Sequence, residues 1–213
     1  MNAIRSGKPV TCDETGWRVG GRGAWLHAAA SKEARAYLID PNRGREATDQ
    51  LIGEHYGGNL VHDGWAPYDR YARATHQQCD AHLLRRCGEM IEVARGAAKC
   101  FPRRIKSILE HALRLRDQRD RGERSLRSCR VHAGKLTRLI RQLCKPRKTN
   151  RANDRLAGFC YRHADELFTF LMHPEIDATN WRGEQALRGA VVNRKVWAGA
   201  ATELGEARKR SRC

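Results

Sequence analysis

One stretch near the start of the chain, Val10-Thr-Cys-Asp-Glu-Thr-Gly-Trp-Arg-Val19, decides the fold because it combines strand-forming residues with an acid in their midst. β-Branched and aromatic residues favour strands whereas Asp is depleted from them, so Asp13 is a candidate functional residue, with a turn former or an edge charge as the alternative. Gly20-Gly21-Arg22-Gly23 follows, and its glycines, which tolerate positive φ, indicate a hairpin turn. We predict two further strands, over 24–28 and 36–39, which complete a three-stranded meander.

The next segments alternate between helix and strand. Residues 44–55 fit a short helix with apolar residues on one face, and 60–62 form a short buried strand after it. A strand that is reached through a helix is expected to run parallel to its neighbour. A fifth strand over 75–79 leads into a helix that begins at Asp80. This order of elements is that of a ribonuclease-H-like fold.

The middle of the chain is helical in pattern and dominated by arginine. Residues 95–155 carry 20 Lys and Arg against 5 Asp and Glu, and apolar residues recur there at helical spacing. We interpret this segment as a helical hairpin with a narrow apolar stripe and a wide basic face. A further helix is expected over 154–172, and the last one begins near Asn180, a residue type that favours the N-cap.

We therefore predict an α/β protein, a ribonuclease-H-like mixed sheet with a large basic helical insertion before the last catalytic helix. In this division 1–92 is the first part of the core, 93–175 the basic insertion, 176–200 the C-terminal helix that completes the core, and 201–213 a charged tail. The 213 residues suffice for one sizeable core with such an insertion, and a hydrophobic content of 40% suits a globular protein.

The net charge of +17 is carried almost entirely by the later part of the chain. Residues 1–90 hold 12 Lys and Arg against 11 Asp and Glu, whereas 91–213 hold 29 against 13. Since so one-sided a charge repels itself without a partner, this part is predicted to bind a polyanion, and the polyanion that we infer is DNA. A solvated helical face rich in arginine is the alternative.

The cysteines indicate free thiols in a reducing compartment. Eight are scattered singly, with no CxxC pair, which does not suit a disulfide frame. The chain shows no secretory signal at its start and no apolar run near the roughly 20 residues that span a bilayer. We expect a soluble cytoplasmic protein that does not associate with membranes.

Two further acids have contexts that point to chemistry. Asp63 follows the fourth predicted strand and precedes Gly64, which permits a sharp exit and close approach of a ligand, although a simple turn is the alternative. Glu184 lies one residue beyond the position that a capping box with Asn180 needs, on an apolar stripe where an unpaired charge is costly. A salt bridge to Arg188, one turn on, is the alternative for Glu184.

Asp13 has a competitor in Glu14, but neighbouring strand residues point to opposite faces, so only one of the two can face a given site. Asp13, Asp63 and Glu184 are three carboxylates from separate segments. Such a set can hold two Mg²⁺ ions, or Mn²⁺ in their place, against a phosphodiester. We predict that these three residues are the metal ligands.

Two other groups of residues are weaker candidates for a functional role. Cys79 and His82 stand at a strand-to-helix junction, where packing near the site suits them better than zinc, because no second ligand pair lies at suitable spacing. Trp65, Tyr68 and Tyr71 could stack on bases, but we favour their being core and turn residues.

Five stretches resemble, in order, segments of the transposases of the insertion-sequence-66 family, which have a DDE catalytic triad. They are residues 13–19, 24–27, 62–68, 79–85 and 184–197. The resemblance implies a ribonuclease-H-like catalytic domain with Asp13, Asp63 and Glu184 as the catalytic triad. It also implies Mg²⁺-dependent DNA cleavage and strand transfer in transposition, with transposon ends and target DNA as partners and a homo-oligomer on the DNA.

The chain also departs from the family pattern. Asn180-Trp181-Arg182-Gly183 stands where the family has an Asn-Asn-x-Ala stretch, and the chain begins almost at the first aspartate. We expect a copy truncated at both ends. The alternatives are a catalytically inactive transposase fragment that only binds DNA, a ribonuclease-H-like nuclease that does not join strands, and a basic RNA-binding or assembly module.

Overall fold

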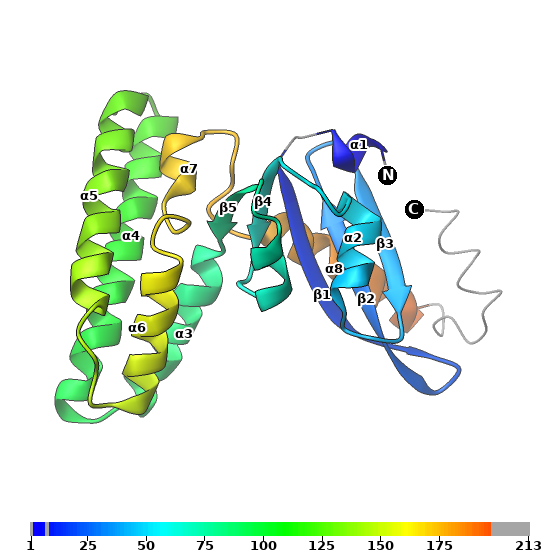
Figure 1. Ribbon diagram of the computed structural model, residues 1–213, viewed down its shortest axis with the longest axis horizontal. Helices are drawn as coiled ribbons and strands as arrows, with labels where there is room; N and C mark the ends of the chain where they lie inside the picture. Colours follow the sequence, from blue (N-terminus) through cyan, green and yellow to red (C-terminus); the bar gives the residue numbers. More distant parts are fainter. Residues whose placement is uncertain (1, 7–8, 197–213) are drawn as a thin grey trace. The chain divides into compact units, whose positions relative to one another are not determined.

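A computed structural model of the chain describes residues 2–6 and 9–196, and Figure 1 shows its elements. Five strands form one mixed sheet in the order β3-β2-β1-β4-β5. The strands are β1 Val10–Val19, β2 Arg22–Ala30, β3 Arg35–Asp40, β4 Asn59–His62 and β5 Thr75–Gln78. β2 pairs antiparallel with both β1 and β3, and β4 pairs parallel with β1. The predicted meander and the parallel fourth strand are confirmed.

Helices occupy much of the remaining described chain. They are α1 Asn2–Arg5, α2 Arg45–Ile52, α3 Asp80–Val93, α4 Cys100–Asp120, α5 Leu126–Cys144, α6 Arg151–Arg162, α7 Thr169–Met172 and α8 Trp181–Val196, with short 3₁₀ helices η1 Ala66–Arg70 and η2 Gly96–Lys99. The predicted α/β class is confirmed, while the ribonuclease-H-like assignment stays a prediction. Among these helices none is long and apolar enough to cross a membrane.

The chain divides into two compact units, each of which is described by itself. The first comprises Met1–Thr75 and Asn180–Cys213, and the second comprises His76–Thr179. The predicted charged tail, 201–213, and the last residues of the predicted 176–200 segment lie outside the described residues. The four-part division of the chain into domains stays a prediction.

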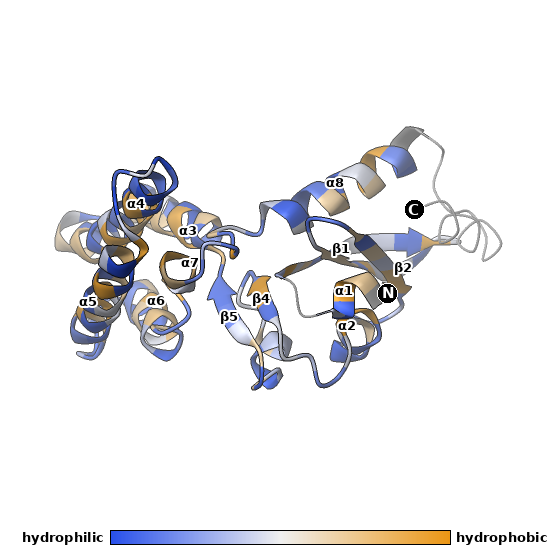
Figure 2. Cartoon of the chain, turned by 90° about the horizontal axis from the view of Figure 1, so that it is seen from above, coloured by the Kyte–Doolittle hydropathy of each residue, from blue (hydrophilic) through white to orange (hydrophobic). Residues whose placement is uncertain are grey.

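In the first unit the two faces of the sheet pack against different helices, because successive strand residues alternate between faces. The cluster under α8 consists of Trp17, Ala24, Leu26, Ala28, Ala30, Ala186 and Leu187. The cluster under α2 includes Val10, Cys12, Ala29, Leu51, Ile52 and Leu60. Figure 2 shows α8 and α2 on opposite sides of the sheet. Odd-numbered residues of β1 therefore face α8, and even-numbered ones face α2.

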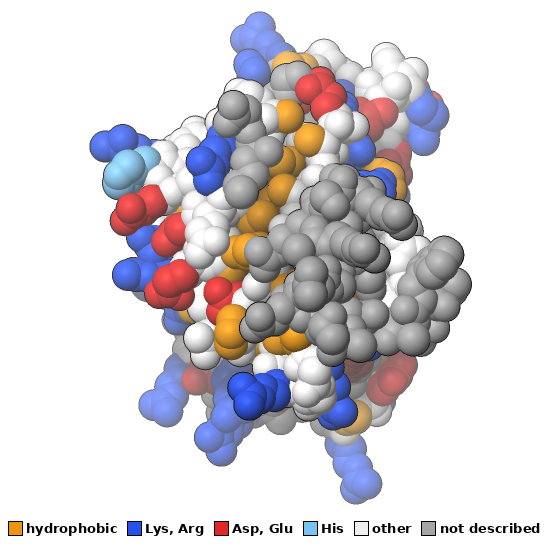
Figure 3. All heavy atoms as spheres, turned by 90° about the vertical axis from the view of Figure 1, so that its right-hand side faces the viewer, with side chains coloured by type: hydrophobic (Ala, Val, Ile, Leu, Met, Phe, Trp, Pro, Cys, Tyr) orange, Lys and Arg blue, Asp and Glu red, His pale blue; other side chains and the backbone are white. Residues whose placement is uncertain are grey.

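Burial in the first unit is graded. Ala28 and Ala29, near the end of β2, are fully buried, whereas Val19, Ile39 and Val191 border the α8 cluster and are only partly buried. Figure 3 shows one face of the molecule, on which hydrophobic side chains form a stripe with charged side chains beside it. The cluster under α8 thus has a partly exposed apolar border.

In the second unit the predicted helical hairpin is present as α4 and α5. The chain turns between them at Gly122, whose φ of 75° is in the region that favours glycine. The two helices bury apolar residues along one side, among them Ile105, Leu109, Leu136 and Ile140. Figure 2 shows hydrophilic and hydrophobic residues along both helices, as amphipathic packing requires.

The prediction of one helix over 154–172 is wrong, because two helices form there. α6 ends at Arg162 and α7 begins at Thr169. Between them Leu167 and Phe168 are buried, and the backbone carbonyl of Glu166 accepts a hydrogen bond from the backbone N–H of Gln78 at 3.0 Å. Since a continuous helix would use that carbonyl in its own ladder, the tertiary contact with β5 overrides the local helical pattern.

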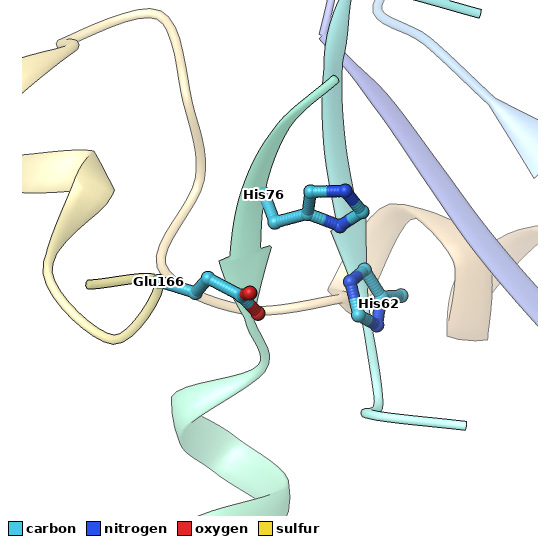
Figure 4. Close-up of side chains that lie close together, drawn as sticks. All are labelled: His62, His76 and Glu166. Atoms are coloured by element: carbon cyan, nitrogen blue, oxygen red, sulfur yellow. The ribbon is translucent and has the colours of Figure 1, made fainter. Parts of the chain in front are cut away.

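The side chain of Glu166 also fastens this turn to the end of β5. Its Oε2 accepts a hydrogen bond from Nε2 of Gln78 at 2.6 Å and lies 2.9 Å from Nδ1 of His163. Figure 4 shows Glu166 and, on β5, His76. Burial raises the pKa of Glu166, but hydrogen bonds from His163 and Gln78 and the charges of both histidines outweigh it and lower the pKa to about 2.

We predict that Glu166→Ala destabilises the protein by about 1–3 kcal/mol at pH 7, because Gln78 and His163 lose their acceptor. The lowered pKa means that this stabilisation is complete above the ordinary value of 4.5 and is lost as the pH falls toward 2. Urea unfolding of the wild type and the variant at pH 7 and pH 3 measures the difference in their free energies of unfolding. The difference between them should shrink at pH 3, and a difference independent of pH would contradict the ionic role.

Candidate functional site

The register of the sheet brings Asp13 and Asp63 level with each other. In the parallel pairing of β1 with β4, Thr11 pairs with Val61. Continuing that pairing by two residues puts Asp13 opposite Asp63, which directly follows the end of β4. Because side chains alternate along a strand, both carboxylates project on the face that α8 covers.

The start of α8 is fastened to β1 beside Asp13. The side-chain Nδ2 of Asn180 donates a hydrogen bond to the carbonyl oxygen of Cys12 at 3.0 Å. Gly183 lies against β1, since a Cβ at this residue would be 3.1 Å from Cβ of Asp13 and 2.7 Å from Oδ1 of Asn180. Glycine therefore lets α8 come close enough for the next residue, Glu184, to lie near Asp13.

The three predicted acids interact electrostatically at Asp13. Burial is the largest cause that raises the pKa of Asp13, and the charges of Glu14, Asp63 and Glu184 raise it further, to about 7. A hydrogen bond from the backbone N–H of Glu14 to Oδ1 of Asp13, 3.0 Å long, acts in the opposite direction. In the described part of the chain, neither Asp13 nor Asp63 forms an ion pair with Lys or Arg. The result is a group of mutually repelling carboxylates.

Glu14, the competitor of Asp13 in the sequence, is neutralised on the opposite face of the sheet. Its Oε1 accepts hydrogen bonds from Nη2 and Nε of Arg43 at 2.6 and 3.1 Å, and its Oε2 accepts one from the hydroxyl group of Tyr68 at 3.0 Å. The Glu14 side chain is only 1% exposed, so it depends on this pairing. The structure therefore assigns Glu14 to a buried ion pair and leaves Asp13 as the acid of β1 that faces α8.

The contacts of Arg43 were not predicted from the sequence. Its guanidinium carbon lies 4.9 Å from the ring centroids of both Trp25 and Trp65, in addition to the ion pair with Glu14. Such cation–π contacts hold the guanidinium over the aromatic rings while it neutralises the carboxylate. In the sequence, residues 41–43 indicated only a break after the third strand, because pairing across the sheet leaves no local signal.

The other weaker candidates pack inside the protein. Tyr68 and Tyr71 are buried at 1% and 2% exposure, so they are core residues and do not stack on bases. Trp65 packs edge-on against Tyr68, with ring centroids 5.5 Å apart. Cys79 is buried directly before α3, and His82 is half-buried in its first turn.

The acids fit a divalent metal by the chemistry of their donors. Carboxylate oxygens are the ligands that Mg²⁺ prefers, and Asp13, Asp63 and Glu184 offer such oxygens from three segments. Their mutual repulsion, which helps to raise the pKa of Asp13, is the kind of interaction that a bound cation relieves. These three residues could therefore hold magnesium.

Comparison with known proteins identifies the class to which the chain belongs. Residues 1–208 match the family model described as "Transposase IS66 family", which covers nearly the whole sequence. The chain belongs to the IS66 family of transposases. Neither the curated proteins nor the solved structures contain a match. Membership of this family indicates a function related to transposition and, in general, an enzyme that cleaves and transfers DNA.

We predict that Gly183→Ala destabilises the protein by about 1–3 kcal/mol, because the added methyl group overlaps Asn180 and crowds Asp13, so that α8 must move away from β1. The same change in Gly189 of α8 is a matched control, since a Cβ there meets nothing within 4 Å. Gly189→Ala should stabilise the helix by about 0.5–1 kcal/mol. Thermal unfolding of both variants measures this, and equal effects would argue against the close approach at Gly183.

Proposed function

We propose that this chain is the catalytic domain of a DDE-type transposase, which cleaves DNA strands and transfers them during transposition, on a ribonuclease-H-like fold with a basic helical insertion. The observation that carries the proposal is the close packing of Gly183, the neighbour of Glu184, against Asp13, whose pKa the charges of Asp63 and Glu184 help to raise. Three carboxylates that separate segments contribute to one site suit the chemistry of phosphodiesters. Membership of the transposase family supports the same activity.

In this proposal Asp13, Asp63 and Glu184 are the catalytic residues and hold two Mg²⁺ ions, for which Mn²⁺ can substitute. When bound, the ions activate the attacking hydroxyl group and stabilise the oxygen that leaves phosphorus. No side chain of the protein needs to form a covalent bond to DNA.

The protein's own groups orient these carboxylates. The backbone N–H of Glu14 holds one oxygen of Asp13 at 3.0 Å, and the backbone N–H of Trp65 holds Oδ1 of Asp63 at 2.9 Å. Glu184 lies in the first turn of α8, where the positive end of the helix dipole favours a carboxylate. Fixed carboxylates need little rearrangement when a cation binds, which favours a defined binding geometry.

The substrate in this proposal is double-stranded DNA, both transposon ends and target sites, and the chain acts as a homo-oligomer assembled on that DNA in the cytoplasm. The excess of Lys and Arg after residue 90 supports a polyanionic partner. Contacts of these residues with phosphates would position the DNA without distinguishing its sequence.

We predict that Asp63→Asn abolishes DNA cleavage and leaves DNA affinity unchanged, because the substitution removes a metal ligand that contributes little to phosphate contacts. Nicking of a labelled duplex that carries a transposon end, in Mg²⁺ or Mn²⁺, measures cleavage, and fluorescence anisotropy in EDTA measures affinity. Equal loss of both activities would refute the role of Asp63.

Asp69→Asn is the matched control for this experiment. Asp69 is an exposed aspartate in η1, six residues beyond Asp63, so its replacement removes the same charge from the same region. The control should cleave DNA like the wild type. Wild-type protein that binds DNA but does not cut it in either metal would support the catalytically inactive fragment instead.

We predict that millimolar Mg²⁺ or Mn²⁺ raises the melting temperature of the wild-type protein, because an ion that binds only the folded state stabilises it by about 2.7 kcal/mol at a concentration of 100 times Kd. Asp13→Asn and Glu184→Gln should lessen this rise. Glu89→Gln, which replaces an exposed acid of α3, should keep it. Thermal shift measurements test this without any activity, and an equal rise in all four proteins would contradict the site.

A further inference from the structure

The charges on helix α5 are unlike those on its neighbour α4. α5 contains five basic residues and no acidic residue, and all five basic residues are exposed: Arg127, Arg130, Lys135, Arg138 and Arg141. The side buried in the second unit carries Cys129, Ala133, Leu136, Ile140 and Cys144. The helix thus has one buried apolar side and one exposed side on which every Lys and Arg lies, together with Val131.

The basic residues of α5 occupy a single face. At 100° per residue, Arg127, Arg130, Lys135, Arg138 and Arg141 fall within an arc of about 140°, opposite the buried side. Arg138 lies eleven residues after Arg127, which at a rise of 1.5 Å per residue separates the two by about 16 Å along the helix. This length corresponds to about five phosphates along one strand of a DNA duplex.

Four of these five cations have no acidic partner in the described part of the chain. Arg141 forms an ion pair with Asp165, whereas no ion pair involves Arg127, Arg130, Lys135 or Arg138.

On and just after α4, by contrast, acidic residues accompany several of the basic ones, although Arg103, Arg104 and Arg114 form no ion pair in the described part of the chain. The pairs are Lys106 with Glu110, Arg116 with Asp117, Arg119 with Asp120, and Arg121 with Glu123. The outer face of α5 therefore differs from α4 because its basic residues have no acidic residue on the same helix.

Gly134 lies in the middle of this basic face, between Arg130 and Arg138. A Cβ at Gly134 would meet nothing within 4 Å, so internal packing does not require a glycine there. Glycine inside a helix costs about 1 kcal/mol relative to alanine. The absence of a side chain leaves room for a partner's backbone to approach the helix between the flanking arginines.

We propose that the outer face of α5 binds the phosphate backbone of duplex DNA, with Arg127, Arg130 and Arg138 as phosphate contacts and Gly134 as the point of closest approach. The inference rests on the proposed function for its choice of DNA, and it adds a binding surface distinct from the acids of the first unit. Positive charge without acids, on one face and over the length of several phosphates, is the pattern that a polyanionic backbone fits.

The test compares two triple variants of the whole protein that lose equal charge. Arg127→Gln, Arg130→Gln and Arg138→Gln together remove three uncompensated cations, and Gln keeps a helix propensity close to that of Arg. Arg45→Gln, Lys106→Gln and Arg121→Gln together remove three cations that are paired with Glu46, Glu110 and Glu123. Circular dichroism and thermal unfolding verify that both variants fold.

Anisotropy titrations of a labelled duplex at several salt concentrations then give the affinity and its salt dependence. The α5 variant should bind about tenfold or more weakly, and the slope of log K against log salt should fall by about 2 to 3, since each lost phosphate contact removes about 0.9. The control variant should keep the wild-type slope. Equal slopes in the two variants, or preferential binding of duplex RNA by the wild type, would overturn the proposal.

Gly134→Leu probes the approach of the backbone without any change in charge. It should weaken DNA binding, whereas Gly158→Leu, on α6 with equally open surroundings, should not. Unchanged binding by Gly134→Leu would overturn the close approach. If the wild-type protein cuts DNA and the α5 variant binds DNA as tightly as the wild type does, the α5 surface is refuted but the proposed function is not. If the wild-type protein does not bind DNA, both are refuted.

Discussion

The close contact between the start of α8 and the middle of β1 is the constraint on which the candidate site depends. Asn180 donates a hydrogen bond to the carbonyl group of Cys12, and Gly183 leaves the space in which α8 approaches Asp13. Tyr37 holds the helix one turn later, through a hydrogen bond from its hydroxyl group to the carbonyl oxygen of Ala186 at 3.2 Å. Without this approach Asp13 and Asp63 would remain as a pair of strand acids.

Charge compensation separates structural acids from candidate functional ones in this molecule. The Glu14 side chain is buried, yet the guanidinium group of Arg43 and the hydroxyl group of Tyr68 satisfy it. Asp13 and Asp63 receive backbone hydrogen bonds but no cation from the described residues. Charge compensation also distinguishes the helices of the second unit, since α5 contains no acidic residue, whereas α4 has acids that pair with some of its arginines.

Local signals in the sequence were sufficient to predict most of the strands and helices. The predicted bounds of β1 agree with the structure, and the turn at Gly20 and Gly21 forms because both residues adopt positive φ, at 54° and 80°. The interruption between α6 and α7 could not be predicted, because it depends on a backbone hydrogen bond from Gln78 to Glu166, far apart in the sequence. Patterns of hydrophobicity describe the helix that a segment can form, not the partner that interrupts it.

The site was predictable to a similar extent. Asp13, Asp63 and Glu184 stood out because each occurs where its residue type is unusual, and in the structure the charges of the latter two help to raise the pKa of the first. The choice between Asp13 and Glu14 needed the ion pair with Arg43, which no spacing along the chain indicates. The close approach at Gly183 likewise depends on packing between segments that the sequence separates by 170 residues.

The order of the two units along the chain has a consequence for biosynthesis. The whole of His76–Thr179 is translated after the two aspartates and before α8, so the acid cluster can be completed only when the ribosome has passed the codon for Glu184. A nascent chain, or one shortened by a stop codon within the second unit, carries strand aspartates without the helix that joins them. Partial products of translation therefore lack the complete carboxylate set.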